Sequence, residues 1–441
     1  MELIEKINRR DVHPRPRILI IHPHPDIDSN LTMAFLLESL SERKVEVDVL
    51  HAEGGGFLSP EPFGDTIHLK VLPYAFFHTP RASVRGLPKR IALKLLFPRR
   101  YPDYWVRFDP VVFGLLKARR YSAIVGVDPH GIALADGLNT WARRPLVYIS
   151  FEIMFAEEVA DTDDDYLKRL ERAACARTSL VLIQDEERAE VFCRETSFPR
   201  DKIVMVPVAP PPCEVVKSDY LRRTLGIPLD MRIVLFCGNL CDWSSRDQLA
   251  EMVSYWPENY CLVIHLPSKV DGRMARHLKR LTEMGRIYIS SQPLPRKDMP
   301  HLISSADFGL APYVPTPDHW WTGDNQYHIG FGSSKVSLYA ACGLPILARS
   351  LPVFDREFAN YKCGKVYRRI VDTGPMLEEM DKNYAHYSNG ARRFYRERLN
   401  PVAGMHRFCK RLLGLAGIDV EEMTQIPADE LDLSATSRAA S

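Results

Sequence analysis

Short apolar runs alternate along the first half of the chain with segments whose apolar residues recur at helical spacing. The run at residues 17–22 is followed by a helical pattern at 31–40 and by a second run at 45–50. Further strands are expected at 123–127, 146–151 and 180–184, and further helices at 166–176 and 186–194. This alternation predicts α/β units with parallel sheets.

A proline-rich segment interrupts the pattern at residues 207–212. Such a segment is extended and semi-rigid, as an interdomain linker would be. After it the alternation resumes, with strands expected at 232–236, 261–265, 287–290, 308–311 and 346–348. We therefore expect an α/β protein with two Rossmann-like doubly wound domains that face a central cleft.

The same pattern sets the domain boundaries. We assign residues 1–206 to the N-terminal domain, 207–214 to the linker and 215–395 to the C-terminal domain. Residues 396–416 belong to a largely helical stretch that closes the folded part. Residues 417–441 turn acidic and end in small and polar residues, so we expect a disordered tail.

Composition narrows the class of protein. The 441 residues are 46% hydrophobic, so the chain can bury a large core, and its length is typical of two domains. The net charge of +2 indicates no particular partner. The nine cysteines include no CxxC pair, and the sequence shows neither a signal peptide nor an apolar stretch of about 18 residues. We therefore expect a cytoplasmic protein without a transmembrane helix.

The most informative stretch is residues 332–348, which indicates a small-residue loop, a short helix and a buried strand. Ser333 or Ser334 can cap the helix, because a hydroxyl there accepts a hydrogen bond from an orphan backbone N–H. Gly343 can take the left-handed conformation that ends a helix. A helix N-terminus offers free N–H groups and a partial positive charge, and Lys335 adds a cation beside them. The stretch therefore predicts a diphosphate-binding site.

This stretch also resembles the donor-site helix of the two-domain nucleotide-sugar glycosyltransferases of the GT-B fold, especially the retaining group called family 4. The resemblance rests on Ser334-Lys335, Tyr339, the small residues 340–343, Pro345 and the strand at 346–348. It implies a hexosyltransferase that moves a sugar from a nucleotide diphosphate sugar to a hydroxyl of a saccharide or lipid-linked glycan. It further implies retention, no metal or other cofactor, a role in polysaccharide biosynthesis, and terminal helices that cross back to the N-terminal domain.

The resemblance places further residues on the donor side. Gly238 ends the first strand of the second domain, where a glycine lets the backbone approach a phosphate closely. Asn239 follows it where the family often has a basic residue, and Arg246 is the candidate for a second basic residue. The other expected donor-binding residues are Gln292, His328, Gly332, Ser333, Ser334 and Lys335. The alternatives are an ordinary strand-to-helix turn at Gly238, a solvated Arg246, and a capped structural helix with a surface lysine.

Two glutamates that many family 4 enzymes carry are missing. Aligned on Gly343, their positions fall at Gly330 and Leu338. The second of these glutamates normally holds the nucleotide ribose. Their loss is the main support for one alternative, a non-catalytic binding protein that kept the GT-B fold. The other alternative is a nucleotide-sugar epimerase on the same fold, which would need acid and base carboxylates near the sugar.

Candidate residues on the acceptor side follow strands of the first domain. Three stand where the family often has a glycine-rich loop, and they can bind hydroxyls: His22, His24 and Asp26. We do not expect a metal there, because a rigid proline separates the two histidines. Three further residues are catalytic candidates: Asp128, His130 and Glu152. Glu152 or His130 would orient an acceptor hydroxyl, or act as general base if the reaction inverts. The alternatives are a helix cap for Asp128 and a solvated rim for Glu152.

Residues 85–107 are rich in Lys and Arg and can form a short amphipathic helix, in which Leu87, Ile91 and Leu95 share one face. A basic amphipathic helix can lie on an anionic bilayer. This predicts a peripheral position at the inner face of the plasma membrane, and the alternative is an ordinary helix packed on its own lobe. The basic residues lack a recognisable nucleic-acid-binding fold, so we expect no nucleic-acid partner.

Overall fold

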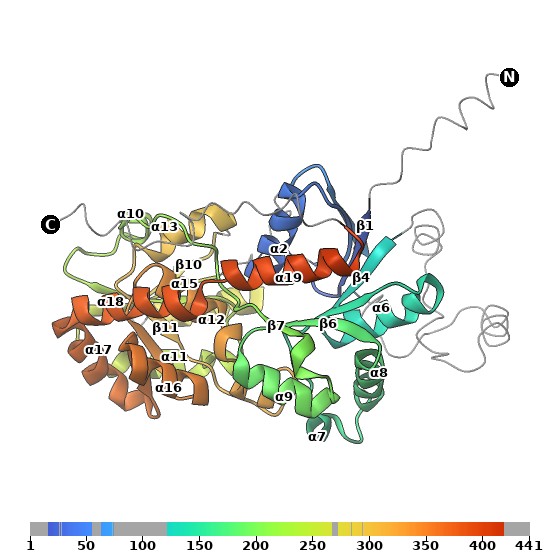
Figure 1. Ribbon diagram of the computed structural model, residues 1–441. Helices are drawn as coiled ribbons and strands as arrows, with labels where there is room; N and C mark the ends of the chain where they lie inside the picture. Colours follow the sequence, from blue (N-terminus) through green and yellow to red (C-terminus); the bar gives the residue numbers. More distant parts are fainter. Residues whose placement is uncertain are drawn as a thin grey trace, which may run out of the picture.

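The computed structural model describes residues 16–25, 27, 29–54, 63–72, 74, 121–266, 272–283, 285–292 and 294–418. These residues form two lobes, each built on one parallel sheet with helices against both faces (Figure 1). Three of the predicted features lie outside the described residues: Asp26, the basic segment at 85–107 and residues 419–441 of the tail.

The first lobe contains a seven-stranded parallel sheet of order β3-β2-β1-β4-β5-β6-β7. Its strands are β1 (Arg17–His22), β2 (Glu46–Ala52), β3 (Ile67–Leu72), β4 (Tyr121–Val127), β5 (Leu146–Ile149), β6 (Thr178–Ile183) and β7 (Ile203–Met205). The helices around it are α2 (Leu31–Glu42), α6 (Asp128–Ala142), α7 (Ala156–Val159), α8 (Asp165–Cys175) and α9 (Glu186–Thr196).

The second lobe contains a six-stranded parallel sheet of order β10-β9-β8-β11-β12-β13. Its strands are β8 (Arg232–Cys237), β9 (Tyr260–His265), β10 (Ile287–Ser290), β11 (Phe308–Ala311), β12 (Ile346–Arg349) and β13 (Gly364–Tyr367). Its helices are α10 (Tyr220–Leu225), α11 (Leu249–Ser254), α12 (Gly272–Thr282), α13 (Met299–Ile303), α14 (Asp324–Tyr327), α15 (Ser334–Ala341), α16 (Pro352–Tyr361), α17 (Thr373–Lys382) and α18 (Tyr384–Phe394). The prediction of two doubly wound α/β domains is therefore confirmed.

The central strands are apolar throughout because both of their faces are covered. In β1, Leu19 and Ile21 pack into a cluster with residues of α6 and α9, whereas Ile18 and Ile20 pack into a cluster with residues of α2. A parallel strand with a core on each side has no solvent face, so its sequence is a continuous apolar run. This is the property that made β1 and β8 recognisable in the sequence.

Three strands were not predicted, and each is a terminal strand of its sheet. β3 is only partly buried along most of its length and carries His68 and Lys70. β7 has three residues and β13 has four. Terminal strands are short and have one unpaired edge, so they do not need a continuous apolar run.

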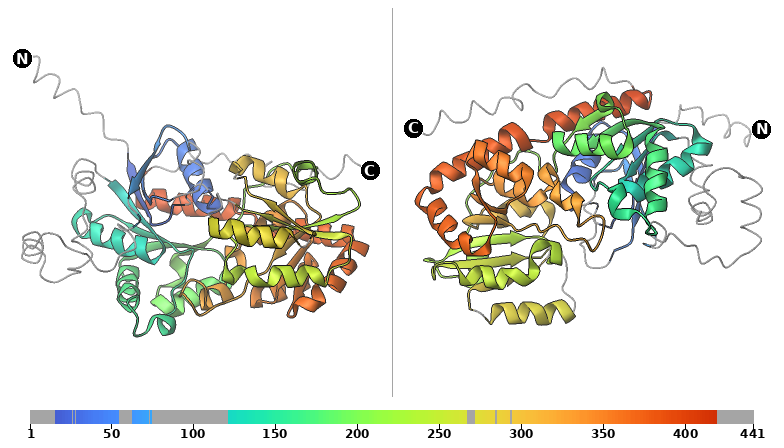
Figure 2. Two further views of the ribbon diagram at one scale, coloured as in Figure 1. Left: turned by 180° about the vertical axis from the view of Figure 1, so that it is seen from behind. Right: turned by 90° about the horizontal axis from the view of Figure 1, so that it is seen from below.

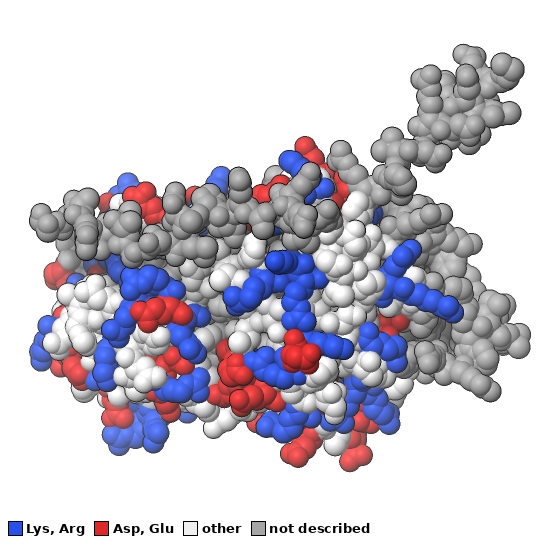
Figure 3. Space-filling model, in the orientation of Figure 1, with Lys and Arg blue, Asp and Glu red and all other residues white. Residues whose placement is uncertain are grey.

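The chain returns to the first lobe at its C-terminal end. After α18, residues Tyr395–Leu399 form a wider turn, and α19 (Val402–Leu415) lies on the first sheet. Met405, Phe408 and Leu412 of α19 pack in the same cluster as Ile18 and Ile20. Figure 2 shows α18 and α19 running across both lobes, and Figure 3 shows basic side chains over the outward face of α19.

Each sheet reverses its direction of winding at one point. In the first sheet this switch point lies between β1 and β4, and in the second it lies between β8 and β11. Parallel sheets bind ligands beyond the carboxyl ends of the strands at such a point. The loops after β1 and β4 and those after β8 and β11 are therefore where a site is expected.

Candidate functional site

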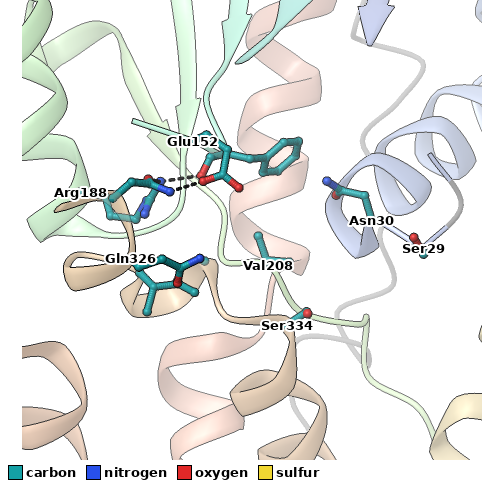
Figure 4. A pocket seen from close by; sticks show the side chains of 11 residues that line it. Ser29, Asn30, Glu152, Arg188, Val208, Gln326 and Ser334 are labelled. Carbon is teal, nitrogen blue, oxygen red and sulfur yellow. Dashed lines mark hydrogen bonds between the residues drawn. The ribbon is translucent and has the colours of Figure 1, made fainter. Parts of the chain in front are cut away.

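Two adjoining cavities lie between the lobes at these strand ends. The larger has a volume of about 790 Å³ and the smaller about 170 Å³. They share lining residues from both lobes: Ser29, Glu152, Gln326, Ile329, Gly332 and Ser334. Figure 4 shows the smaller cavity, with Asn30 and Ser29 on one side and Arg188 and Gln326 on the other. One continuous cleft is thus bounded by both lobes.

The N-terminus of α15 opens into this cleft. Ser333 caps the helix, because its hydroxyl accepts from the backbone N of Val336 at 3.2 Å. Its Oγ also lies 2.8 Å from the hydroxyl of Tyr313. Ser334 and Lys335, the next two residues, line the larger cavity. The sequence predicted that either Ser333 or Ser334 caps the helix, and in the structure the cap is Ser333.

Lys335 is held against aromatic rings. Its side chain is 6% exposed, and Nζ lies 5.4, 5.3 and 4.9 Å from the ring centroids of Phe236, Trp243 and Tyr313. Among the described residues, no carboxylate forms an ion pair with it. Ring faces attract an ammonium group more weakly than an anion does once water is excluded. The position therefore favours an anionic ligand.

The end of β8 completes this part of the cleft. Gly238 has φ +139°, and a Cβ at this residue would lie 2.9 Å from Nζ of Lys335. A side chain at 238 would push the end of the Lys335 side chain aside, and the positive φ also favours glycine. Asn239 follows it, is exposed and lines the larger cavity.

Glu152 is the carboxylate that the first lobe presents to both cavities. Asn325 donates a hydrogen bond to one of its oxygens, and Figure 4 shows the carboxylate directed into the cavity. Burial, followed by the nearby charge of Asp128, raises the pKa of Glu152 to about 7. The side chain is partly buried, not a solvated rim. At neutral pH it can therefore both accept and release a proton.

Asp128 fixes the turn that carries Glu152. One of its oxygens accepts from the backbone N of Phe151 at 2.7 Å and of Glu152 at 2.9 Å. The other lies 2.9 Å from Nε2 of His24. Asp128 has φ +56° and makes no cap hydrogen bond to α6, so the alternative of a helix cap is wrong. It positions Glu152 and does not line either cavity.

Arg188 of α9 joins the two lobes behind Glu152. Its guanidinium donates to the side chains of Gln184 and Asn325 and to the carbonyls of Phe151 and His328. Asn325 also accepts from the backbone N of Ile153 at 2.9 Å. The sequence assigned neither Arg188 nor Asn325 to the site, because the contacts that join them across the lobes are more than 130 positions apart in the sequence.

The two positions of the missing glutamates differ in structure. Gly330 has φ +43°, and a Cβ there would lie 2.4 Å from a carboxylate oxygen of Asp185. The same oxygen accepts from the backbone N of Phe331 at 2.7 Å. A carboxylate of the first lobe thus occupies the space that a side chain at 330 would need. Leu338 lines the larger cavity as an apolar residue.

The remaining candidates lie outside the two cavities. Gln292 is exposed, and neither it nor Arg246 lines either cavity. His328 lies against the first lobe, with Nδ1 2.9 Å from Glu187 and its ring stacked on Phe155. His22 ends β1, His24 lies in the loop after it, and His130 lies in the first turn of α6; none of them lines either cavity.

The structure also adds cleft residues that the sequence did not indicate: Trp243, His265, Arg296, Lys297 and Trp321. Burial lowers the pKa of His265 to about 4, so this ring is neutral at pH 7, and its Nδ1 lies 2.9 Å from the Ser290 hydroxyl. Arg296 pairs with Glu38 of α2 across the cleft. The sequence of one strand end does not indicate which residues from other strand ends will lie next to it in the cleft.

Comparison with known proteins gives the fold its name. No family model matches the sequence, and no curated protein matches it. Among solved structures, HepE from Anabaena in complex with UDP-glucose has a TM-score of 0.63 at 14% identity, covering 90% of this chain and 99% of that chain. This chain has the GT-B fold.

Two further structures with this fold are similar over their whole length. Sucrose-phosphate synthase from Thermosynechococcus elongatus has a TM-score of 0.63 at 13% identity, covering 91% of this chain and all of that chain. WaaG, a glycosyltransferase involved in lipopolysaccharide biosynthesis, has a TM-score of 0.59 at 14% identity, with 90% and 100% covered. At these identities the likeness shows the GT-B fold, as the resemblance at residues 332–348 predicted.

None of the described helices is long and apolar enough to cross a membrane. The same part of the chain contains no group of three or more His, Cys, Asp or Glu residues arranged to hold a metal ion.

Proposed function

We propose that this protein is a glycosyltransferase that uses a nucleotide diphosphate sugar. The observation that carries the proposal is Lys335, a buried ammonium group that faces the cleft at the N-terminus of α15 and pairs with no carboxylate among the residues that the structure describes. A diphosphate would supply an anion, and the free N–H groups of the helix would donate hydrogen bonds to its oxygens. The solved neighbours that contain UDP or UDP-glucose support this choice of ligand.

The same groups can promote departure of the diphosphate. Negative charge grows on the leaving oxygen as the sugar–phosphate bond breaks. Lys335 and the N-terminus of α15 are already fixed where that charge would develop, so they need not reorganise during the reaction. These groups supply positive charge without a metal ion. We therefore propose that transfer is metal-independent, which activity in the presence of EDTA would support.

We propose Glu152 as the general base on the opposite wall. Its pKa of about 7 suits proton acceptance at neutral pH, and its carboxylate faces the cavity that Ser334 and Gly332 also line. A base on the acceptor side favours direct displacement, with inversion at the anomeric carbon. This differs from the retention that the resemblance implies. The anomeric proton signals of the first-formed product distinguish the two outcomes.

The acceptor is proposed to be a hydroxyl of a saccharide or a lipid-linked glycan, as the resemblance implies. The cytoplasmic and peripheral membrane location and the role in polysaccharide biosynthesis are proposals on the same footing. A vesicle-binding assay with the intact chain and anionic or neutral phospholipids tests the membrane contribution separately. Binding that is equal for both vesicle types would contradict it.

The first experiment is thermal unfolding with UDP, GDP, ADP, TDP and CMP. A ligand bound only by the folded state stabilises it by about 2.7 kcal/mol at 100 times its dissociation constant. We expect one nucleoside diphosphate to raise the transition, and Lys335→Ala to abolish the shift. Lys297→Ala, which removes an exposed lysine of the same cleft, is the matched control and should keep most of the shift.

A lack of response to all five nucleotides would overturn the proposal and favour the non-catalytic alternative. Nucleotide binding without transfer or donor hydrolysis would favour that alternative as well. Conversion of the donor to its sugar epimer, without transfer, would favour the epimerase alternative.

A further inference from the structure

The loop between β11 and α14 presents two adjacent tryptophans in opposite ways. Trp320 is buried in a cluster with Met154, Leu167 and Leu170 of the first lobe. Trp321 is 40% exposed and lines the larger cavity. The second lobe is thus anchored to the first by Trp320, and the same anchor leaves the Trp321 indole in the cleft.

The conformation of Trp321 is held from several sides. The ring of His319 stacks on it, with centroids 4.3 Å apart and planes 11° apart. Trp320 meets it edge-on, at 5.4 Å and 89°. The loop is closed by a hydrogen bond from the backbone N of Thr322 to the carbonyl of His319 at 2.9 Å. A flat apolar surface is therefore fixed in a cleft that is lined by both apolar and polar side chains.

Asn325 connects the backbone of Trp321 to the proposed base. Its Nδ2 donates to the carbonyl of Trp321 at 3.1 Å and to the carboxylate of Glu152. The backbone that carries the indole is therefore tied to the carboxylate through one side chain. Ser29, Gln326 and Ser334 line the same cavity and add hydrogen-bonding groups around it.

We propose that Trp321 and Glu152 bound the acceptor subsite, and that its occupant is a pyranose ring. A pyranose has one face of C–H groups and an edge of hydroxyls. The C–H face would lie on the indole, which offers a large, rigid apolar surface, and a hydroxyl would reach Glu152. An acyl chain would gain from the indole but would offer no hydrogen bond to the Glu152 carboxylate.

The reaction balances with these groups alone. The acceptor hydroxyl forms a bond to the anomeric carbon of the donor sugar, and its proton passes to the Glu152 carboxylate. The bond from the anomeric carbon to the phosphate oxygen breaks, and its electron pair leaves with the diphosphate beside Lys335. This chemical step rests on the proposed function, whereas binding of a pyranose at Trp321 does not.

Saturation-transfer NMR tests the binding directly. The probes are the methyl pyranosides of glucose, galactose, mannose and N-acetylglucosamine, each added to the intact protein with and without UDP. We expect ring C–H signals of at least one probe to receive saturation. Trp321→Ala should weaken that binding by about tenfold or more, whereas Trp321→Phe should keep part of it. Tyr255→Ala, which removes an equally exposed aromatic residue that lines neither cavity, should change nothing.

Absence of saturation transfer to every pyranoside overturns the inference, as does unchanged binding in Trp321→Ala. Failure of the proposed function is a separate result, because it appears as the lack of any response to the nucleoside diphosphates. Once a donor is known, Trp321→Ala should raise the KM for acceptor while the KM for donor stays within about twofold. An equal rise in both would also contradict an acceptor-side role.

Discussion

Each lobe contributes one buried cation to the lining of the cleft, and the surroundings of the two cations differ. Arg188 of the first lobe is 1% exposed and donates to two side chains and two carbonyls. Lys335 of the second lobe is 6% exposed, and its ammonium group lies over three aromatic rings. A buried cation with all its donors satisfied is part of the framework, whereas one left without an anion marks a binding site. Burial alone therefore does not distinguish a framework cation from a binding-site cation, whereas the groups around the cation do.

The largest effect expected is on stability, from Arg188→Ala. This change leaves Glu152, Asp185 and Asp128 without their compensating charge and orphans the acceptors of the guanidinium. We expect a loss of about 3–5 kcal/mol in the free energy of unfolding, measured by urea denaturation. Arg172→Ala, at an exposed arginine of the same lobe, should stay within about 0.5 kcal/mol. If Arg188→Ala lost no more stability than Arg172→Ala, the assignment of Arg188 to the framework would be wrong.

The next effect concerns Glu152→Gln, which keeps an acceptor for Asn325 but cannot take a proton. We expect kcat to fall by about 10²–10³-fold with nucleotide binding unchanged. In the wild type, kcat/KM should fall as pH decreases below about 7, because the base becomes protonated. A wild-type activity that stays level from pH 8 to pH 5.5 would argue that Glu152 only positions substrate.

Glu152→Gln is also expected to change the free energy of unfolding in a pH-dependent way. The folded-state pKa of Glu152 is raised above 4.5, so the folded state binds the proton more tightly than the unfolded state. Folding is therefore increasingly opposed as pH rises from about 4.5 to 7, where the buried group becomes charged. Glu152→Gln should raise the free energy of unfolding at pH 8 by about 1–2 kcal/mol and leave it nearly unchanged at pH 4.5.

A smaller loss is expected from Gly330→Ala. The new Cβ would press on Asp185, the residue that accepts from Phe331 and caps α9 beside Arg188. We expect a loss of about 1–3 kcal/mol, because positive φ and a close contact act together. Gly226→Ala is the matched control: Gly226 has φ +65° with nothing within 4 Å of the added Cβ, so only the backbone strain remains. Equal losses in the two variants would contradict the proposed contact.

The smallest stability effect is expected from Lys335→Met, which places an apolar chain of similar length among the three rings. We expect the free energy of unfolding to change by less than about 1 kcal/mol, or to increase, because a buried charge is removed. A loss as large as that of Arg188→Ala would mean that Lys335 belongs to the framework. The same variant should lose the nucleotide response, so the measurement separates binding from folding.

The donor helix was predictable because its signals are local. The cap at Ser333, the stop at Gly343 and the cation at Lys335 lie within eleven residues, and each acts through the backbone next to it. The central strands were predictable for a similar reason, since burial on both faces leaves a continuous apolar run. These features need no knowledge of the rest of the chain.

The network around Glu152 could not be read in the same way. Asn325 is 173 positions from Glu152 and 137 from Arg188, and the three meet because the loop after β11 reaches the other lobe. The sequence supplied Glu152 as a strand-end carboxylate but gave no sign of its burial. Trp321 escaped notice because a tryptophan next to another tryptophan does not show which ring will be buried. The displaced candidates Arg246 and Gln292 show the converse, since polar residues near a strand end need not reach the cleft.

The position of α19 has a consequence for how the chain is made. Met405, Phe408 and Leu412 cover one face of the first sheet, although they are synthesised after the whole second lobe. Domains usually fold in order as they leave the ribosome. Here the first lobe leaves the ribosome with one apolar face uncovered. Its core is completed only when α19 follows, after the whole second lobe has been synthesised. A fragment ending near residue 206 would keep that face open, so the first lobe is a separate body in shape but not in folding.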